Sequence, residues 1–212
     1  MPRSELERRN YNFEVRAEET ENGDILTGRP IVYNSRTDLG YFDEIIEQGA
    51  LDGADLTDVR FLVNHDISKI PLARSRRNNG NSTMKLTPDA FGLNMDYVRL
   101  DVNNNSEARA LKSAVQRGDI SGMSFMFSVD DEEWSELESD HPTRHIKKIG
   151  SVVEVSAVTF PAYESTEIYA RSKAALENAR SALEKARQQK EEPLDSGELE
   201  LLKEKTKILG GK

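Results

Sequence analysis

Three polar side chains in otherwise apolar surroundings are of the types that cooperate to activate a serine. Ser124 lies within an alternating apolar run, His65 follows another after Asn64, and Glu154 interrupts a third, valine-rich one. A serine hydroxyl is a weak nucleophile at neutral pH, so it needs a general base within hydrogen-bond reach, and a further group to orient that base. These residues therefore predict a base-activated serine nucleophile.

The spacing around Ser124 predicts a strand over residues 120–129. Because side chains alternate between the two faces of a strand, one face carries an apolar set that we expect to pack inward: Met123, Phe125, Phe127 and Val129. Ser124 is then expected to point away from that core, and Gly122 beside it leaves space for a substrate backbone. Ser121, in the same motif, is the alternative nucleophile.

Histidine is the natural base because its charge changes nearest neutral pH. The chain has three, His65, His141 and His145. His65 follows a short apolar strand, and a strand end would hold it firmly in place. The other two flank Pro142 in a polar loop, where a solvated histidine is expected. The three do not show the ligand spacing of a metal site, so we expect no metal.

Glu154 is the first choice for the group that orients the base. A charged side chain in a strongly apolar strand is rarely left unpaired, and against an imidazole it would hold the ring and stabilise the imidazolium. Asp66 and His145 remain alternatives for the third member. Asp66 is adjacent to His65 in the sequence, which directs its side chain elsewhere.

Composition restricts the classes of protein that remain. The chain has 212 residues, a net charge of −9 and no cysteine. The acidic balance argues against nucleic acid or an anionic membrane as a partner, and no apolar run reaches the roughly 18 residues of a membrane span. The charged N-terminus lacks the apolar core of a secretory signal. Without cysteine there are no disulfides, thiolate metal sites or cysteine nucleophile, which fits a reducing cytoplasm.

Strand patterns dominate the chain before residue 172. They are expected at 12–17, 24–28, 30–33, 59–63, 83–86, 92–100, 120–129 and 151–160, with an acidic loop from 130. Pro30 limits its strand to an edge or a bulge. One helix is expected from about 106 to 116, begun by Ser106 as N-cap and ended by Gly118. This pattern predicts a mainly β barrel or sandwich decorated by helices.

Composition changes sharply near Ser172, where Lys, Glu, Ala, Leu, Gln and Arg become dominant. Apolar residues at helical spacing predict a charged helix over 173–190, and a second amphipathic segment follows the break at 193–197. We therefore expect a main domain over residues 1–171 and a helical tail over 172–212. The tail is either a solvated helix or an element that docks the main domain on an assembly.

Six segments occur in the order seen in a known family: residues 42–51, 61–66, 70–74, 92–93, 118–127 and 154–162. In this respect the chain resembles the prohead (capsid maturation) proteases of tailed bacteriophages, of the HK97 type. The similarity covers about residues 12 to 171. That family is related in fold to the herpesvirus assembly proteases, so the resemblance implies a β-barrel ringed by helices.

The resemblance also implies roles and partners. It implies Ser124 as nucleophile, His65 as base and Glu154 as orienting group, with no cofactor. The implied substrates are the major capsid protein and scaffold segments, cleaved inside the phage procapsid in the host cytoplasm. A homodimer is allowed by analogy with the herpesvirus enzymes. The alternative function is a catalytically silent scaffold module for capsid assembly, but a silent relative would be free to lose one of the three residues.

Overall fold

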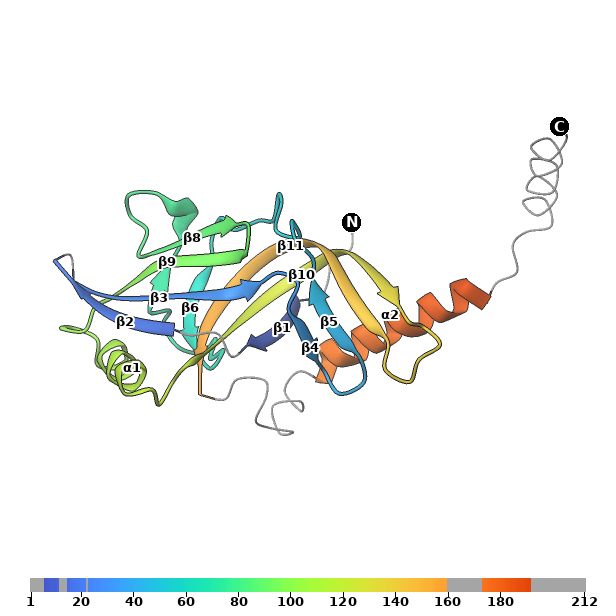
Figure 1. The fold of residues 1–212 in the computed structure, drawn as a ribbon. Helices are drawn as coiled ribbons and strands as arrows, with labels where there is room; N and C mark the ends of the chain where they lie inside the picture. Colours follow the sequence, from blue (N-terminus) through green and yellow to red (C-terminus); the bar gives the residue numbers. More distant parts are fainter. Residues whose placement is uncertain (1–5, 12–14, 22, 160–172, 192–212) are drawn as a thin grey trace, which may run out of the picture. The chain divides into compact units, whose positions relative to one another are not determined.

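The computed structural model describes residues 6–11, 15–21, 23–159 and 173–191, and strands make up most of them. The chain divides into two compact units, Met1–Leu176 and Glu177–Lys212. The first unit contains every strand among the described residues (Figure 1). The expectation of a mainly β protein with few helices is therefore correct.

The larger sheet has seven strands and carries the strand of Ser124. Its main path runs β1-β10-β11-β5-β4, and β6 pairs with both β11 and β7. The strands are β1 (Leu6–Tyr11), β4 (Arg36–Asp38), β5 (Asp43–Ile46), β6 (Arg60–Val63), β7 (Ala73–Arg74), β10 (Gly122–Ser135) and β11 (Thr143–Val158). β5 and β6 both run parallel to β11, whereas β10 is antiparallel to it. The strand β1 was not predicted, because its sequence is almost entirely charged or polar.

The hairpin of β10 and β11 is longer than the sequence pattern predicts. The acidic residues 130–133 were expected in a loop, but β10 continues through them to Ser135, and β11 begins at Thr143 rather than near 151. Opposite charges across the two strands explain the difference, since such pairs stabilise a sheet. Asp131 faces Lys148 in the register, and Lys147 lies 3.4 Å from Glu133.

The smaller sheet has four strands in the order β2-β3-β9-β8. They are β2 (Val15–Thr20), β3 (Gly23–Val32), β8 (Met84–Asp89) and β9 (Gly92–Leu100). The two runs predicted around Pro30 form the single strand β3, with a register irregularity between Gly28 and Ile31. The predicted bulge at this proline is thus present. Gly92 has φ +142°, and a Cβ there would lie 2.0 Å from the Ile31 carbonyl oxygen, so this close crossing needs glycine.

Two helices and one short 3-10 turn complete the described elements. The 3-10 turn is η1 (Arg76–Asn78), and α1 (Ser106–Arg117) begins one residue after its N-cap, Asn105, whose side chain accepts two backbone N–H groups. The sequence predicted Ser106 as the cap, but Ser106 is the first residue of the helix. Gly118 ends α1 in the left-handed region, as predicted. The tail helix α2 spans Lys173–Glu191. None of the described helices has the length and apolarity to cross a membrane.

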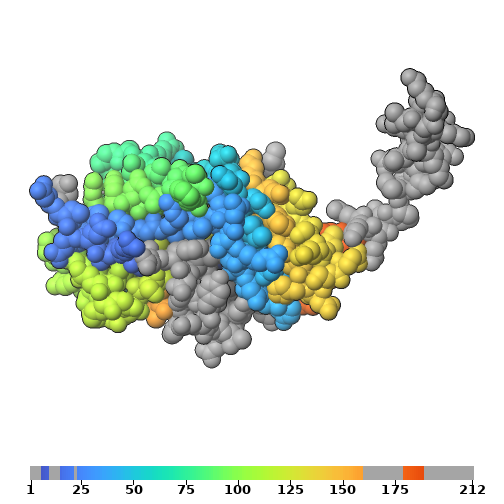
Figure 2. All heavy atoms as spheres, in the orientation of Figure 1, coloured from blue at the N-terminus to red at the C-terminus, as the bar shows by residue number. Residues whose placement is uncertain are grey.

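One apolar cluster joins the two sheets and α1. It includes Leu26 and Met95 from the smaller sheet, Phe125 and Val155 from the larger one, and Leu111 from α1. In the space-filling view, blue and green segments of the smaller sheet gather at one end of this unit, and the yellow tip of the β10–β11 hairpin is at the other (Figure 2). Two predicted segments, 12–14 and 199–208, lie outside the described residues.

Candidate active site

The structure brings Ser124, His65 and Glu154 together in one chain of hydrogen bonds. His65 Nε2 lies 2.5 Å from Ser124 Oγ, and His65 Nδ1 lies 2.5 Å from Glu154 Oε2. All three side chains are largely removed from water, because Ser124 is fully buried and the side chains of His65 and Glu154 are 10% and 4% exposed. An imidazole between a hydroxyl and a carboxylate can take a proton from the first while the second stabilises its positive form.

Neighbouring strands of the larger sheet fix these positions. Ser124 on β10 pairs in register with Ser156 on β11, two residues beyond Glu154. Because β6 runs parallel to β11, with Val63 beside Ala157, the chain leaves β6 directly alongside these residues. The Asn64 N–H then donates to the Ala157 carbonyl, which continues the pairing up to His65.

The turn that carries His65 has an uncommon backbone. Asn64 and His65 have φ values of 52° and 57°, in the left-handed region that most residues avoid. The Asn64 side chain holds the turn to the end of β11, because it donates to Thr159 Oγ1 at 3.0 Å and accepts the Thr159 N–H at 2.9 Å. Such strain persists only where surrounding contacts fix it, and it is frequent at functional sites.

Ser156 is a member of the site that the sequence analysis did not select. Its Oγ accepts the backbone N–H of His65 at 3.0 Å and donates to Glu154 Oε1. The residue is fully buried and ties the histidine's backbone to the carboxylate that contacts its ring. The sequence contained a signal for it, since residues two apart on a strand share a face and Ser156 is the next polar residue after Glu154.

Ser124 was expected on an open face of its strand, but the structure places it on a covered face. Of the predicted inward set, Met123, Phe125 and Phe127 are buried and Val129 is partly buried. Ser124 is also fully buried, because both faces of β10 are covered here. Its Oγ donates to the backbone carbonyl of Arg9 on β1 at 2.7 Å. The sequence therefore predicted correctly which side chains of the strand pack inward. The prediction that its second face is exposed was wrong.

The alternative residues lie apart from this hydrogen-bonded chain. Ser121 is exposed ahead of β10. Asp66 accepts hydrogen bonds from the backbone and hydroxyl of Ser68. His145 contacts Glu47 through Nδ1 and Ser135 through Nε2 instead of His65.

A buried ionic cluster lies on the face of β1 and β10 that is opposite to Ser124. We use this name for Glu7, Arg9, Glu44, Glu132 and Arg144. Arg9 contacts Glu44 at 2.5 Å and Glu7 at 2.6 Å, and Arg144 contacts Glu7 at 2.7 Å and Glu44 at 3.0 Å. Burial alone would raise the pKa of Glu7, but the two guanidinium groups outweigh it and lower this pKa to about 2. Burial alone would lower the pKa of Arg9 and of Arg144. The neighbouring carboxylates outweigh this effect, so both pKa values are raised.

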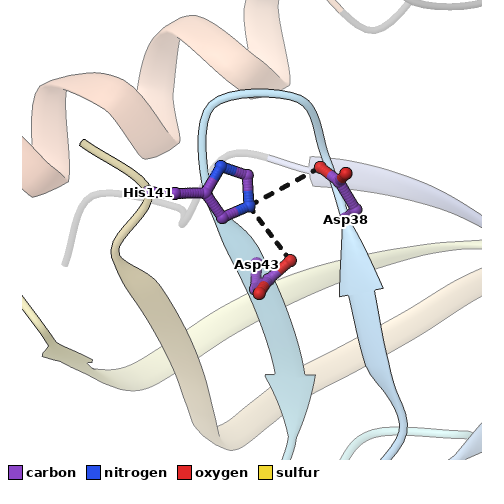
Figure 3. Close-up of side chains that lie close together, drawn as sticks. All are labelled: Asp38, Asp43 and His141. Atoms are coloured by element: carbon purple, nitrogen blue, oxygen red, sulfur yellow. Dashed lines mark hydrogen bonds and ion pairs between the residues drawn. The ribbon is translucent and has the colours of Figure 1, made fainter. Parts of the chain in front are cut away.

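A second group of polar side chains has the composition of a metal site. Asp38, Asp43 and His141 gather where β4 and β5 meet the start of β11 (Figure 3). His141 Nε2 lies 3.1 Å from Asp43 and 3.7 Å from Asp38, and Arg36 lies 3.1 Å from the other oxygen of Asp43. The hydrogen bond of His141 with Asp43 and the ion pair of Arg36 with Asp43 link three of these four residues.

Two comparisons with known proteins match most of this chain. The sequence profile of the caudovirus prohead serine protease family matches residues 11–181. The prohead protease of Enterobacteria phage HK97 is 32% identical over an alignment of 151 residues, and the match covers 69% of this chain and 59% of that protein. This chain thus spans about three fifths of the length of that relative, and no solved structure matches it significantly. The matched region contains Ser124, His65 and Glu154, and the chain belongs to the caudovirus prohead serine protease family.

Proposed function

We propose that this protein is a serine endopeptidase that cleaves the major capsid protein and scaffold segments during maturation of a phage procapsid. Ser124 is the nucleophile, His65 the general base and Glu154 the group that orients the base. The observation that carries this proposal is the continuous hydrogen-bonded chain from Ser124 Oγ through both nitrogens of His65 to Glu154 Oε2. Membership of a family of serine peptidases supports it.

The arrangement accounts for both halves of peptide hydrolysis. As Ser124 Oγ bonds to the substrate carbonyl carbon, its proton passes to His65 Nε2, and Glu154 stabilises the imidazolium that forms. When the carbon–nitrogen bond breaks, Nε2 returns this proton to the leaving amine and an acyl-enzyme remains. A water molecule then attacks the ester, His65 accepts its proton and gives it to Ser124, and the acid product leaves.

Co-expression with the cognate capsid protein tests the nucleophile. Ser124→Ala should abolish processing, whereas Ser128→Ala should process normally. Ser128 is a matched control because it is a buried serine on the same face of β10, where its hydroxyl contacts Ser151. A Ser121→Ala protein should also remain active. Normal processing by Ser124→Ala would overturn the proposal.

The alternative is a catalytically silent scaffold module, and the full burial of Ser124 is the observation that favours it. The same experiment separates the two functions. A silent module would leave the capsid protein uncut in every variant while still entering procapsids. Cleavage that depends on Ser124 excludes it.

We further infer the setting of the reaction. The enzyme acts inside the procapsid, in the host cytoplasm, on substrates held at high local concentration. The two sheets, which share one apolar cluster, are the two parts of a herpesvirus-protease-like barrel, and a homodimer is the expected assembly by that analogy. An experimental structure and the mass of the protein in solution test these two points.

A further inference from the structure

The N-terminal strand β1 lies along the strand that carries Ser124. It pairs antiparallel with β10 over six residues, from Leu6 beside Ser128 to Tyr11 beside Met123. β1 is the last strand on this side of the sheet, so without it the adjacent edge of β10 would have unpaired backbone groups (Figure 1). An exposed edge of this kind is a template for binding an extended peptide by strand addition.

The contact at Ser124 places a peptide carbonyl at the nucleophile. Asn10 pairs with Ser124 in the register, and the Arg9 carbonyl accepts the Ser124 hydroxyl at 2.7 Å. A hydroxyl has one proton to donate, and here it has two neighbours that accept one, the Arg9 carbonyl and His65 Nε2. While Ser124 donates to Arg9, its proton is not shared with the base that must remove it.

We propose that this edge of β10 is the site where an extended peptide substrate binds, and that β1 occupies it as an internal blocking strand. A substrate segment binds antiparallel to β10 only after β1 has left. The inference rests on the proposed function, since it concerns access to the same serine. It accounts for the full burial of Ser124 in a protein of a peptidase family.

The composition of β1 suits a strand that can detach. Its described side chains are Leu6, Glu7, Arg8 and Arg9, and the single apolar one among them, Leu6, is 48% exposed. Among these four side chains, those of Glu7 and Arg9 anchor the strand through the ionic cluster, in addition to the backbone pairing of β1 with β10.

The charges of the cluster are arranged so that detachment leaves no ion without a partner. β1 removes one carboxylate and one guanidinium, Glu7 and Arg9. Arg144 then still contacts Glu44 at 3.0 Å and Glu132 at 2.9 Å. Loss of only one member of a buried pair is strongly destabilising, whereas the loss of β1 as a whole is balanced.

The test measures how fast a fluorophosphonate probe labels Ser124, with the labelled residue identified by mass spectrometry. The full-length double variant Glu7→Gln/Arg9→Gln weakens the anchoring of β1 and keeps Arg144 paired with Glu44. We expect it to label at least about tenfold faster than the wild type. Arg8→Gln is the matched control, because the Arg8 side chain is outside the cluster, and it should label at the wild-type rate.

A chain without residues 1–11 gives a second, independent comparison. It should label as fast as the double variant or faster, and the added peptide of residues 6–11 should slow that labelling where a scrambled peptide does not. Equal labelling of the wild type, the double variant and the shortened chain, all folded by circular dichroism, overturns the blocking strand and leaves the proposed function intact. Labelling of none of them overturns the proposed function and this inference with it.

Discussion

At the scale of single residues, the protein contains two glutamate–histidine pairs with different surroundings, of which only the first belongs to the candidate site. His65 contacts Glu154 and also Ser124, whereas His145 contacts Glu47 and Ser135. Both pairs combine an imidazole with a carboxylate and a hydroxyl. The first is nearly buried, while His145 and Glu47 have 22% and 30% of their side chains exposed. A low-dielectric environment strengthens the interaction of an imidazolium with its carboxylate.

Glu154→Gln should lower the rate of peptide cleavage by up to about 10⁴-fold. The amide keeps the size of the side chain, but it cannot stabilise the imidazolium, and the equivalent change in the Ser-His-Asp triad has an effect of that size. Glu47→Gln alters the other glutamate–histidine pair and should leave the rate nearly unchanged. Steady-state cleavage of a capsid-derived peptide measures both. The opposite ranking would identify His145 and Glu47 as the functional pair.

Ser156→Ala should reduce kcat by up to about 100-fold with little change in KM. The hydroxyl holds the His65 backbone and Glu154 in place without touching the substrate, and small misplacements of catalytic groups have effects of this size. Ser151→Ala is the control, since Ser151 also lies on β11 and contacts a serine of β10. A change in thermal stability equal in both variants, without a selective loss of kcat, would reduce Ser156 to a structural residue.

At the scale of elements, β1 and β10 show how a polar sequence becomes a strand. Nothing in the run Leu6–Tyr11 alternates between apolar and polar, yet its backbone pairs with β10 and two of its charges enter the buried ionic cluster. The partner strand and the complementary charges decide this structure.

The protein should lose stability in acid, because protonation of Glu7 removes a stabilising charge. The pKa of Glu7 is about 2 in the folded protein and 4.5 as the ordinary value. A lowered folded pKa contributes stability that is complete above the unfolded value and is lost as pH falls from about 4.5 to about 2. At about 1.4 kcal/mol per pH unit, this loss is on the order of 3 kcal/mol.

Denaturant unfolding of the wild type and Glu7→Gln across this pH range checks the effect. The variant should be less stable at neutral pH, and its free energy of unfolding should change less between pH 4.5 and 2. Glu21→Gln, a change at an exposed residue, should follow the wild type. An unchanged acid slope in Glu7→Gln would show that Glu7 does not sense the two arginines as the geometry indicates.

At the scale of the whole molecule, we propose that residues 172–212 act as a tether. A chain ending at Arg171 should keep its melting temperature nearly unchanged and should still process a capsid peptide. Its content in procapsids should fall by at least about tenfold, because tethering raises the effective concentration of enzyme at its substrate. Loss of folding would show that the tail contributes to the main domain. Normal incorporation would place the targeting signal elsewhere.

The sequence by itself determined the mainly β architecture and the helix α1 with its glycine end. Period-two alternation of apolar residues carries this information locally, and so does the conformational freedom of Gly118. It also singled out Ser124, His65 and Glu154, because each is a polar residue in or beside an apolar strand. The sequence pattern did not predict the charged strands, which are residues 130–133 of β10 and the strand β1. Their pairing depends on partners distant in the chain.

Only the tertiary structure decided how the site is assembled and covered. Ser124 and His65 are 59 residues apart and Glu154 is 89 residues from His65, so their contact depends on β6 pairing in parallel with β11. Strand parity predicts on which face a side chain lies, but not what covers that face. The burial of Ser124 and the contact of its hydroxyl with Arg9 result from long-range packing, for which no local pattern in the sequence is a signal.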